Sequence, residues 1–355
     1  MPTALYAYLL PLAALLLGYG GPLMSLPAST VFILLAMALL MGSALSAVQH
    51  AERIAARLRP PFGTLVLTFS VTTIEVSVLA SLMLHGGNNP TLAREAVLST
   101  VMFVLTGVVG LCMLVGGLRH REQEVHQQGL AGYLSVIIAI SVLALILPDV
   151  TWSRGRGPIV QTDVIFIMLG VVALYGSFLF MQTVRYRDHY IGTVEEHSAP
   201  PQTGAFLAAI AFLLLSLWGV VVLSTSVAAG VERLVIDLHL EDPDAVVGAV
   251  VVTMLLLPET ITAVKAARRN QLQRALNTAL GSALATIGLT MPAMVAIGYV
   301  LNQHVELSLD PEDRIQLLLA LIISIVSFGT GKTNQLTGHV HLVLFFIYVM
   351  TLFTP

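Results

Sequence analysis

Long apolar runs separated by short polar stretches dominate the chain. They fall near residues 4–20, 29–48, 63–84, 94–116, 130–150, 159–182, 204–224, 245–266, 274–300, 314–330 and 338–354. Each approaches the roughly 20 residues with which an α-helix crosses the hydrocarbon layer of a membrane. Strands of a membrane barrel would instead alternate apolar and polar residues over about ten positions. The pattern therefore predicts an all-α, polytopic membrane protein with about eleven transmembrane helices.

The composition agrees with a chain that is almost wholly membrane domain. Of its 355 residues, 56% are apolar and only 10% are charged, whereas a soluble domain has roughly 25% charged residues. No basic tract suggests nucleic acid as a partner, and the single cysteine, Cys112, excludes an internal disulfide and a cysteine-rich metal site. Because no Lys or Arg precedes the first apolar run, we expect a retained helix there rather than a cleaved signal peptide.

The Lys and Arg positions predict how the chain lies in the membrane, because short basic loops stay in the cytoplasm. Alternate loops collect most of these residues on one side: Arg53, Arg57, Arg59, Arg119, Arg121, Arg185, Arg187, Lys265, Arg268, Arg269, Arg274 and Lys332. The other side has Arg94, Arg154, Arg156, Arg233 and Arg314, together with acids that we interpret as solvated loops: Glu232, Asp237, Glu241, Asp242, Asp244, Glu306, Asp310, Glu312 and Asp313. We expect an inner (plasma) membrane protein with a cytoplasmic N-terminus and an external C-terminus.

An internal repeat divides the chain into two halves. Residues from Leu92 can be laid without gaps on those from Leu272, so that Arg94 meets Arg274. By the loop assignment the two halves cross the membrane in opposite directions. The prediction is two inverted five-helix repeats, at 29–184 (helices 2–6) and 204–355 (helices 7–11). A cytoplasmic linker at 185–203 joins them, and an extra first helix with its loop occupies 1–28. Inverted repeats with a binding site near the midplane are typical of alternating-access transporters.

Two acidic residues, Glu75 and Glu259, lie near the middle of helices at corresponding places in the two halves. A charge at the centre of a membrane helix costs roughly 2.5 to 3.5 kcal/mol, so it usually faces a cavity or a partner. The plainer alternative is a protonated side chain that hydrogen-bonds a neighbouring helix. Two such carboxylates close together would bind a cation, and when empty they would bind protons, because desolvation and mutual repulsion disfavour two bare charges. Competition between cation and protons for one site is the minimal chemistry of an antiporter.

Other oxygen atoms could complete the ligand set. Thr68 and Thr72 share a helical face with Glu75, and Pro258 removes the hydrogen bond to the carbonyl of Met254. The next helix of each half adds further oxygens, from Ser99, Thr100, Thr106, Asn277, Ser282 and Thr286. Calcium takes about 6 to 8 oxygen ligands, which such a set could supply. Alternatively, these small polar residues only let helices approach one another.

Several stretches resemble a known family: FGTLVLTFSVTTIEV, VGLCMLVGGLRHREQE, MQTVRYRDHY and LLPETITAVKAARRNQLQRALNTALGSALATIGLTMP. They are similar to the bacterial Cha-type calcium/proton antiporters of the calcium/cation antiporter superfamily. The resemblance implies eleven helices, inverted halves and transport of Ca²⁺, with Na⁺ and K⁺ as further substrates. Related exchangers carry Gly-Asn-Ala-x-Glu in each repeat, whereas this chain has VTTIE and LLLPE. The asparagine ligand is thus missing beside Glu75 and Glu259.

Other motifs do not point to enzymatic chemistry. The segment SFGTGKTNQ has Val326 where a phosphate loop needs its first glycine. His339 and His341 are two apart on a helix and face different sides, which argues against a shared metal site. We expect a secondary Ca²⁺/H⁺ antiporter without a cofactor, whose partners are its ions and the lipid bilayer; the sequence makes no prediction of oligomeric state. A Na⁺ or K⁺/H⁺ antiporter in the same scaffold and, from another class, a cation channel are the alternatives.

Overall fold

The computed structural model describes residues 5–23, 30–58, 62–85, 90–148, 161–186, 190, 203–237, 243–301, 303 and 305–353. Several sequence predictions fall on other residues and so lie outside this part of the chain. They include most of the linker at 185–203, the basic residues Arg59, Arg154, Arg156 and Arg187, and the loop acids Glu241 and Asp242.

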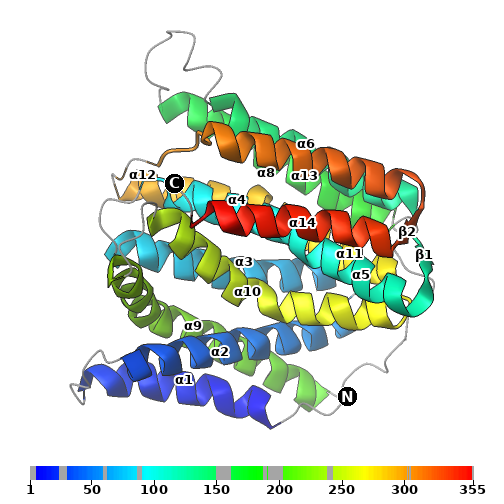
Figure 1. Cartoon of the computed structure of the whole chain (residues 1–355). Helices are drawn as coiled ribbons and strands as arrows, with labels where there is room; N and C mark the ends of the chain where they lie inside the picture. Colours follow the sequence, from blue (N-terminus) through cyan, green and yellow to red (C-terminus); the bar gives the residue numbers. More distant parts are fainter. Residues whose placement is uncertain are drawn as a thin grey trace. The chain divides into compact units, whose positions relative to one another are not determined.

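Eleven helical rods account for nearly all of the described residues, as the apolar runs predict (Figure 1). Those of the first half are α1 (Tyr6–Leu23), α2 (Thr30–Arg57), α3 (Phe62–His85), α4–η1–α5 (Leu92–Met102, Phe103–Val108, Val109–His120), α6–η2 (Gln127–Ser141, Val142–Ile146) and α8–η3 (Gln161–Phe180, Met181–Arg185). Those of the second half are α9 (Thr203–Asp237), α10 (Pro243–Arg268), α11–η5–α12 (Leu272–Ala285, Thr286–Thr290, Met291–Val300), α13 (Pro311–Gly329) and α14 (Gln335–Thr351). The segments named η are single stretches of π-helix.

Eight helical segments among the described residues are long and apolar enough to cross a membrane by length and composition. Two shorter apolar helices, Tyr6–Gly20 and Gln335–Thr351, accompany them. Many large apolar side chains on these helices are exposed, including Phe166 at 78% and Leu16 at 75%. An apolar exterior of this kind fits a protein that is solvated by lipid rather than by water.

The chain divides into two compact units, each built from segments of both sequence halves. Unit 1 comprises residues 1–89 and 196–243, and so contains α1, α2, α3 and α9; unit 2 comprises 90–195 and 244–355. In unit 1, the Ser46 hydroxyl of α2 donates to the carbonyl of Ala7 at 2.5 Å and lies 3.0 Å from the Ser216 hydroxyl of α9. Similarly, the hydroxyl oxygens of Ser81 on α3 and Ser224 on α9 lie 2.6 Å apart. Buried hydroxyl pairs thus link these helices.

Unit 2 contains a pair of helices, α5 and α14, whose backbones lie in close contact. A β-carbon placed on Gly338 would lie 2.5 Å from the backbone nitrogen of Leu114, and one placed on Gly117 would lie 2.6 Å from that of Gln335. Glycine is therefore required at both positions, because any side chain would force the two helices apart. Small residues at helix interfaces serve the same purpose in many membrane proteins.

A short antiparallel ribbon joins two loops of unit 2. Strand β1 (Glu122–Glu124) pairs with β2 (Lys332–Asn334), with Gln123 opposite Thr333 (Figure 1). The sequence analysis, which excluded only the strands of a membrane barrel, did not predict this ribbon. Strands of three residues are too short for a period-2 pattern to be recognised. The segment that superficially resembles a phosphate loop, SFGTGKTNQ, spans the end of α13, the turn at residues 330–331, strand β2 and the first residue of α14.

The π-helical segments η1 and η5 lie in the two stretches that the repeat aligns. In both, the equivalent threonine donates its hydroxyl to the carbonyl four residues earlier: Thr106 to Met102, and Thr286 to Ser282 at 3.2 Å. The two aligned stretches thus share a π-helical segment and the same threonine hydrogen bond. Periodicity cannot reveal a π-helical turn, so these segments are absent from the prediction.

Candidate cation site

In unit 1, one face of α3 carries the predicted ligands Thr68, Thr72 and Glu75. Glu75 is 6% exposed, Thr72 is 8% exposed and Thr68 is half-buried. Their spacing of four and three residues places them on successive turns of one face. A carboxylate buried in a transmembrane helix is costly to keep without a function, so its position supports the prediction that Glu75 serves ion binding.

Thr72 differs from its hydroxyl-bearing neighbours on α3. Ser70 donates to the carbonyl of Val66 and Thr73 to that of Phe69, both at 2.7 Å, and Ser77 donates to that of Thr73 at 2.6 Å. The hydroxyl of Thr72 is buried but has no hydrogen-bond partner among the described residues. A buried polar group without a partner costs about 1 to 3 kcal/mol. Because it lies one turn from Glu75, this hydroxyl oxygen is well placed to coordinate a cation.

In unit 2, α10 places Glu259 and Pro258 in the middle of the helix. Glu259 is half-buried, and Met254 is 8% exposed. The helix is continuous from Pro243 to Arg268, so Pro258 does not interrupt it. Proline lacks one donor, but the hydrogen bonds of the adjacent turns persist, as membrane helices commonly allow.

The hydroxyls of Ser99 and Thr100 on α4 are fully buried in unit 2 and already engaged. The Ser99 hydroxyl lies 2.9 Å from the hydroxyl of Tyr348, and Thr100 donates to the carbonyl of Ala96 at 3.0 Å. These bonds favour helix packing, the plainer of the two readings, for this pair. Ser282 on α11 is 8% exposed, and its carbonyl accepts the hydroxyl of Thr286.

Asn277, in the second turn of α11, uses both ends of its amide within unit 2. Its oxygen accepts from the side chain of Gln273 at 2.9 Å, and its nitrogen donates to the carbonyl of Tyr190. The Gln273 oxygen in turn accepts from the backbone of His126 at 2.8 Å. Asn277 therefore belongs to a network that fastens the start of α11 to neighbouring loops. These contacts compete with its predicted role as a cation ligand.

A buried ion-pair network at the start of α4 escaped the sequence analysis. The guanidinium of Arg94 contacts Glu95 at 2.8 Å, Asp310 at 2.7 Å and Glu306 at 3.7 Å, and it donates to the carbonyl of Ser308. The side chains of Arg94 and Glu95 are 7% and 3% exposed. The side chains of Glu306 and Asp310 are 40% and 58% exposed, as expected for acids of a solvated loop, but both also pair with Arg94, which the sequence analysis did not predict. The Arg-Glu dipeptide at the start of an apolar run could have indicated a buried ion pair, but the sequence analysis used Arg94 only to align the repeats.

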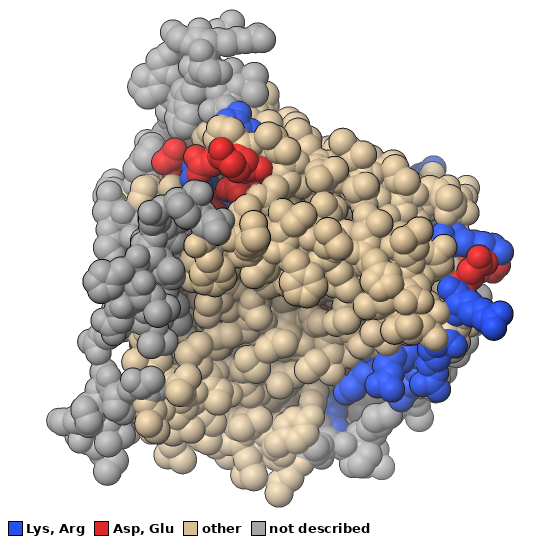
Figure 2. Space-filling view, in the orientation of Figure 1, with Lys and Arg blue, Asp and Glu red and all other residues tan. Residues whose placement is uncertain are grey.

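Opposite charges occupy opposite ends of unit 2. Arg94 starts the α4–α5 rod together with Glu306 and Asp310, whereas Arg119 lies at the end of the rod. His120 contacts the carbonyl of Arg268 at 3.1 Å, which places the end of α10 beside Arg119. Figure 2 shows most of the visible acidic side chains in one area and most basic side chains in another, where a smaller acidic patch lies among them. This separation agrees with the two sides assigned from the loops.

A comparison with protein families identifies the scaffold. The sodium/calcium exchanger protein family matches the chain in two stretches, residues 28–184 and 208–354. The chain belongs to this family. It is therefore a multi-pass membrane protein of a cation-exchanger family, as the resemblance to the calcium/cation antiporter superfamily predicted.

Curated relatives of the exchanger match over nearly the whole chain. A Sinorhizobium fredii (strain NBRC 101917 / NGR234) protein, named as a candidate ionic transporter, is 41% identical over 91% of this chain and 88% of its own length. The sodium-potassium/proton antiporter ChaA of Escherichia coli (strain K12) is 32% identical over 96% of this chain and 94% of its own. A Ca²⁺/H⁺ antiporter of Aphanothece halophytica is 26% identical over 85% and 84%.

Solved structures show the same fold at low sequence identity. The structure of native YfkE matches with a TM-score of 0.77 and 18% identity over 98% of this chain and all of its own. The H⁺/Ca²⁺ exchanger CAX matches with a TM-score of 0.70 and 15% identity over 97% of this chain and 88% of its own. At these identities the likeness concerns the arrangement of helices.

Proposed function

We propose that this exchanger is a secondary antiporter that carries Ca²⁺ in one direction and protons in the other, with Glu75 and Glu259 as the groups that bind them in turn. The observation that carries the proposal is the buried face of α3, where the carboxylate of Glu75 lies one turn from the Thr72 hydroxyl, which has no hydrogen-bond partner in the described part of the chain. The relative from Aphanothece halophytica is named as a Ca²⁺/H⁺ antiporter, which supports Ca²⁺ and H⁺ as the two transported ions.

Charge explains why exchange would be coupled. Two carboxylates are neutralised equally by one Ca²⁺ or by two protons, whereas the empty site keeps two negative charges in a poorly solvated place. A carrier that reorients readily only when its site is neutral must load one ion or the other before each crossing. Ca²⁺ would take further oxygens, such as the Thr68 and Thr72 hydroxyls and the carbonyl of Met254.

The halves of the chain would form the two inverted repeats of such a carrier. The family matches twice, at 28–184 and 208–354, which supports the division into 29–184 and 204–355 after an extra first helix. The charge separation within unit 2 supports a cytoplasmic N-terminus and an external C-terminus in the bacterial inner membrane.

Monovalent cations are the second candidate substrates. The Escherichia coli relative is named as a sodium-potassium/proton antiporter and is more similar to this chain than the Ca²⁺/H⁺ antiporter of Aphanothece halophytica. The chain also lacks the asparagine that related exchangers carry beside each glutamate. A site with fewer strong ligands for a divalent ion could accept Na⁺ or K⁺.

Reconstitution in proteoliposomes with an internal pH dye tests the proposal. Ca²⁺, Na⁺ or K⁺ would be added to liposomes that contain the wild type, Glu75→Gln, Glu259→Gln or the control Glu124→Gln, whose side chain is 82% exposed. We expect Ca²⁺ to move protons in the wild type and the control and in neither of the other variants. Proton movement with Na⁺ or K⁺ but not Ca²⁺ would select the second candidate. Cation flux without proton movement would indicate a channel, and full exchange in both variants would exclude these glutamates.

A further inference from the structure

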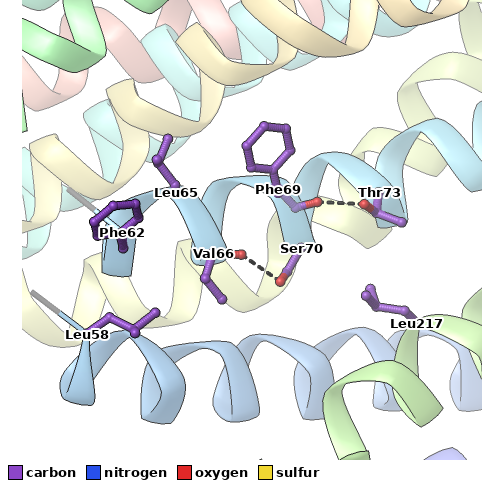
Figure 3. Close-up of a pocket in the computed structure, with 8 residues that line it drawn as sticks. All are labelled: Leu58, Phe62, Leu65, Val66, Phe69, Ser70, Thr73 and Leu217. Carbon is purple, nitrogen blue, oxygen red and sulfur yellow. Dashed lines mark hydrogen bonds between the residues drawn. The ribbon is translucent and has the colours of Figure 1, made fainter. Parts of the chain in front are cut away.

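Unit 1 contains an apolar groove of about 400 Å³ along the first half of α3. One wall consists of α3 from Phe62 to Thr73, and Leu58 and Leu217 complete the lining. Figure 3 shows the α3 residues in order above Leu58 and Leu217, which stand at opposite ends of the view. The rings of Phe62 and Phe69 are 61% and 57% exposed, so the groove opens to the surface of the unit.

The groove offers hydrocarbon rather than polar groups, even though two hydroxyl residues line it. Ser70 and Thr73 each donate to the carbonyl four residues earlier, both at 2.7 Å (Figure 3). Their donors are therefore occupied, and the remaining wall is aliphatic and aromatic. A cation would find few ligands there, whereas an alkyl chain would leave no polar group without a hydrogen bond.

One end of the groove lies beside basic side chains. Arg57, the last residue of α2, directly precedes Leu58, and its guanidinium lies 4.7 Å from the ring centroid of Phe206. Arg53 is one turn earlier on α2 and donates to the hydroxyl of Tyr8 at 3.2 Å. Glu52, also on this stretch of α2, is exposed, and two arginines against one glutamate leave a net positive charge here. An anionic group at this end would therefore meet positive charge.

The length of the groove is close to half of the roughly 30 Å hydrocarbon thickness of a bilayer, the depth that the acyl chains of one leaflet fill. From Phe62 to Thr73 along α3, eleven residues advance roughly 16 Å at 1.5 Å per residue. Along α9, the step from Phe206, beside Arg57, to Leu217, in the lining, covers the same number of residues. Both helices therefore give the same separation between the basic end of the groove and its far end.

We infer that this groove is a binding site for an anionic phospholipid, with one acyl chain along α3 toward Leu217 and the phosphate headgroup at Arg57. Basic residues near a membrane surface attract anionic lipids by about 1 kcal/mol each, which corresponds to about fivefold in affinity. The groove would hold this acyl chain at a fixed place, whereas the lipids that surround a membrane protein exchange freely. The inference does not depend on which cation the protein transports.

Native mass spectrometry of the full-length, detergent-solubilised protein tests this inference. Dioleoyl phosphatidylglycerol or dioleoyl phosphatidylcholine would be titrated onto the wild type, Leu217→Trp, which fills the groove, and Leu214→Trp as a control. Leu214 lies on the same helix, is 61% exposed and does not line the groove. We expect one saturable phosphatidylglycerol in the wild type and the control, with affinity lowered about tenfold in Leu217→Trp, an effect of about 1.4 kcal/mol.

The headgroup is tested separately, with a variant at an exposed position. Arg57→Gln should lower the preference for phosphatidylglycerol over phosphatidylcholine about fivefold. Arg185→Gln is the matched control, because Arg185 also ends a helix and its guanidinium lies 5.9 Å from the ring centroid of Tyr186. Unsaturable lipid binding, or equal binding by the wild type, Leu217→Trp and Arg57→Gln, would overturn the inference.

Discussion

Arg94 and Asp310 form an ion pair of 2.7 Å between the guanidinium Nη2 and the carboxylate Oδ2, although 216 positions separate them along the chain. The same guanidinium also binds Glu95 and the carbonyl of Ser308. One buried arginine therefore fastens the extended segment before α13 to the first turn of α4. Sequence distance gave no indication of this connection.

Removal of Arg94 should destabilise the protein markedly. Arg94→Gln would leave the buried carboxylate of Glu95 without its cationic partner, and breaking a buried pair in this way costs about 3 to 5 kcal/mol. We expect a clear fall in the melting temperature of the detergent-solubilised protein. Lys332→Gln is the control, because the Lys332–Glu124 pair spans 3.5 Å with side chains 58% and 82% exposed, and such pairs contribute about 0 to 1 kcal/mol. Equal melting temperatures for both variants would contradict the role of Arg94.

Thr72→Val should weaken cation binding without unfolding the protein. Valine preserves the shape of the buried side chain but removes the hydroxyl oxygen beside Glu75. We expect the half-saturating Ca²⁺ concentration for proton release from proteoliposomes to rise by about tenfold, a loss of about 1.4 kcal/mol. Thr73→Val is the matched control, since the Thr73 hydroxyl is already bonded to the carbonyl of Phe69. If both variants keep the wild-type value, the Thr72 oxygen is not a ligand.

Pro258→Ala tests whether the carbonyl of Met254 takes part in transport. Alanine supplies the backbone donor that proline lacks, so it would bond to that carbonyl and compete with an ion. We expect a more stable α10 and a lower affinity for the cation in the same liposome assay. Unchanged affinity together with a raised melting temperature would show that Pro258 acts on the helix alone.

His341 should matter for stability far more than its near neighbour His339. Its Nδ1 lies 2.7 Å from the carbonyl of Leu105, which can only accept, so Nδ1 donates and Nε2 accepts from Ser327 at 2.9 Å. His341→Phe would strand the carbonyl and the hydroxyl in a fully buried place, at about 1 to 3 kcal/mol each. His339→Phe, at an exposed position, should leave the melting temperature almost unchanged. The opposite order would mean that the Leu105 carbonyl finds another donor.

The two histidines also confirm the sequence argument that residues two apart on a helix face different sides, because one is buried and the other exposed. The helical rods themselves were predictable for a similar reason: an apolar run of membrane length leaves the backbone no alternative to a helix. The ends of the helices were harder to predict. The run at 29–48 becomes a helix that continues to Arg57, because AERIAAR is too polar for lipid but consists of good helix formers.

The candidate site was predictable only in part. Burial of Glu75 and Thr72 follows from an acidic residue and a hydroxyl on one face of an apolar helix. The engagement of Asn277 by Gln273 and Tyr190 could not be foreseen, since it depends on a loop contact 87 positions away. The ion pairs of Arg94 were equally hidden, because a charge beside an apolar run does not show which distant loop will meet it.

The contact between α5 and α14 limits how the exchanger can move. Where Gly117 and Gly338 bring two backbones together, neither helix can slide or rotate against the other without a steric clash. The pair therefore behaves as one rigid element within unit 2, with the ribbon of β1 and β2 at one end. Whatever rearrangement opens the ion pathway first to one side and then to the other, these two helices must travel as one piece.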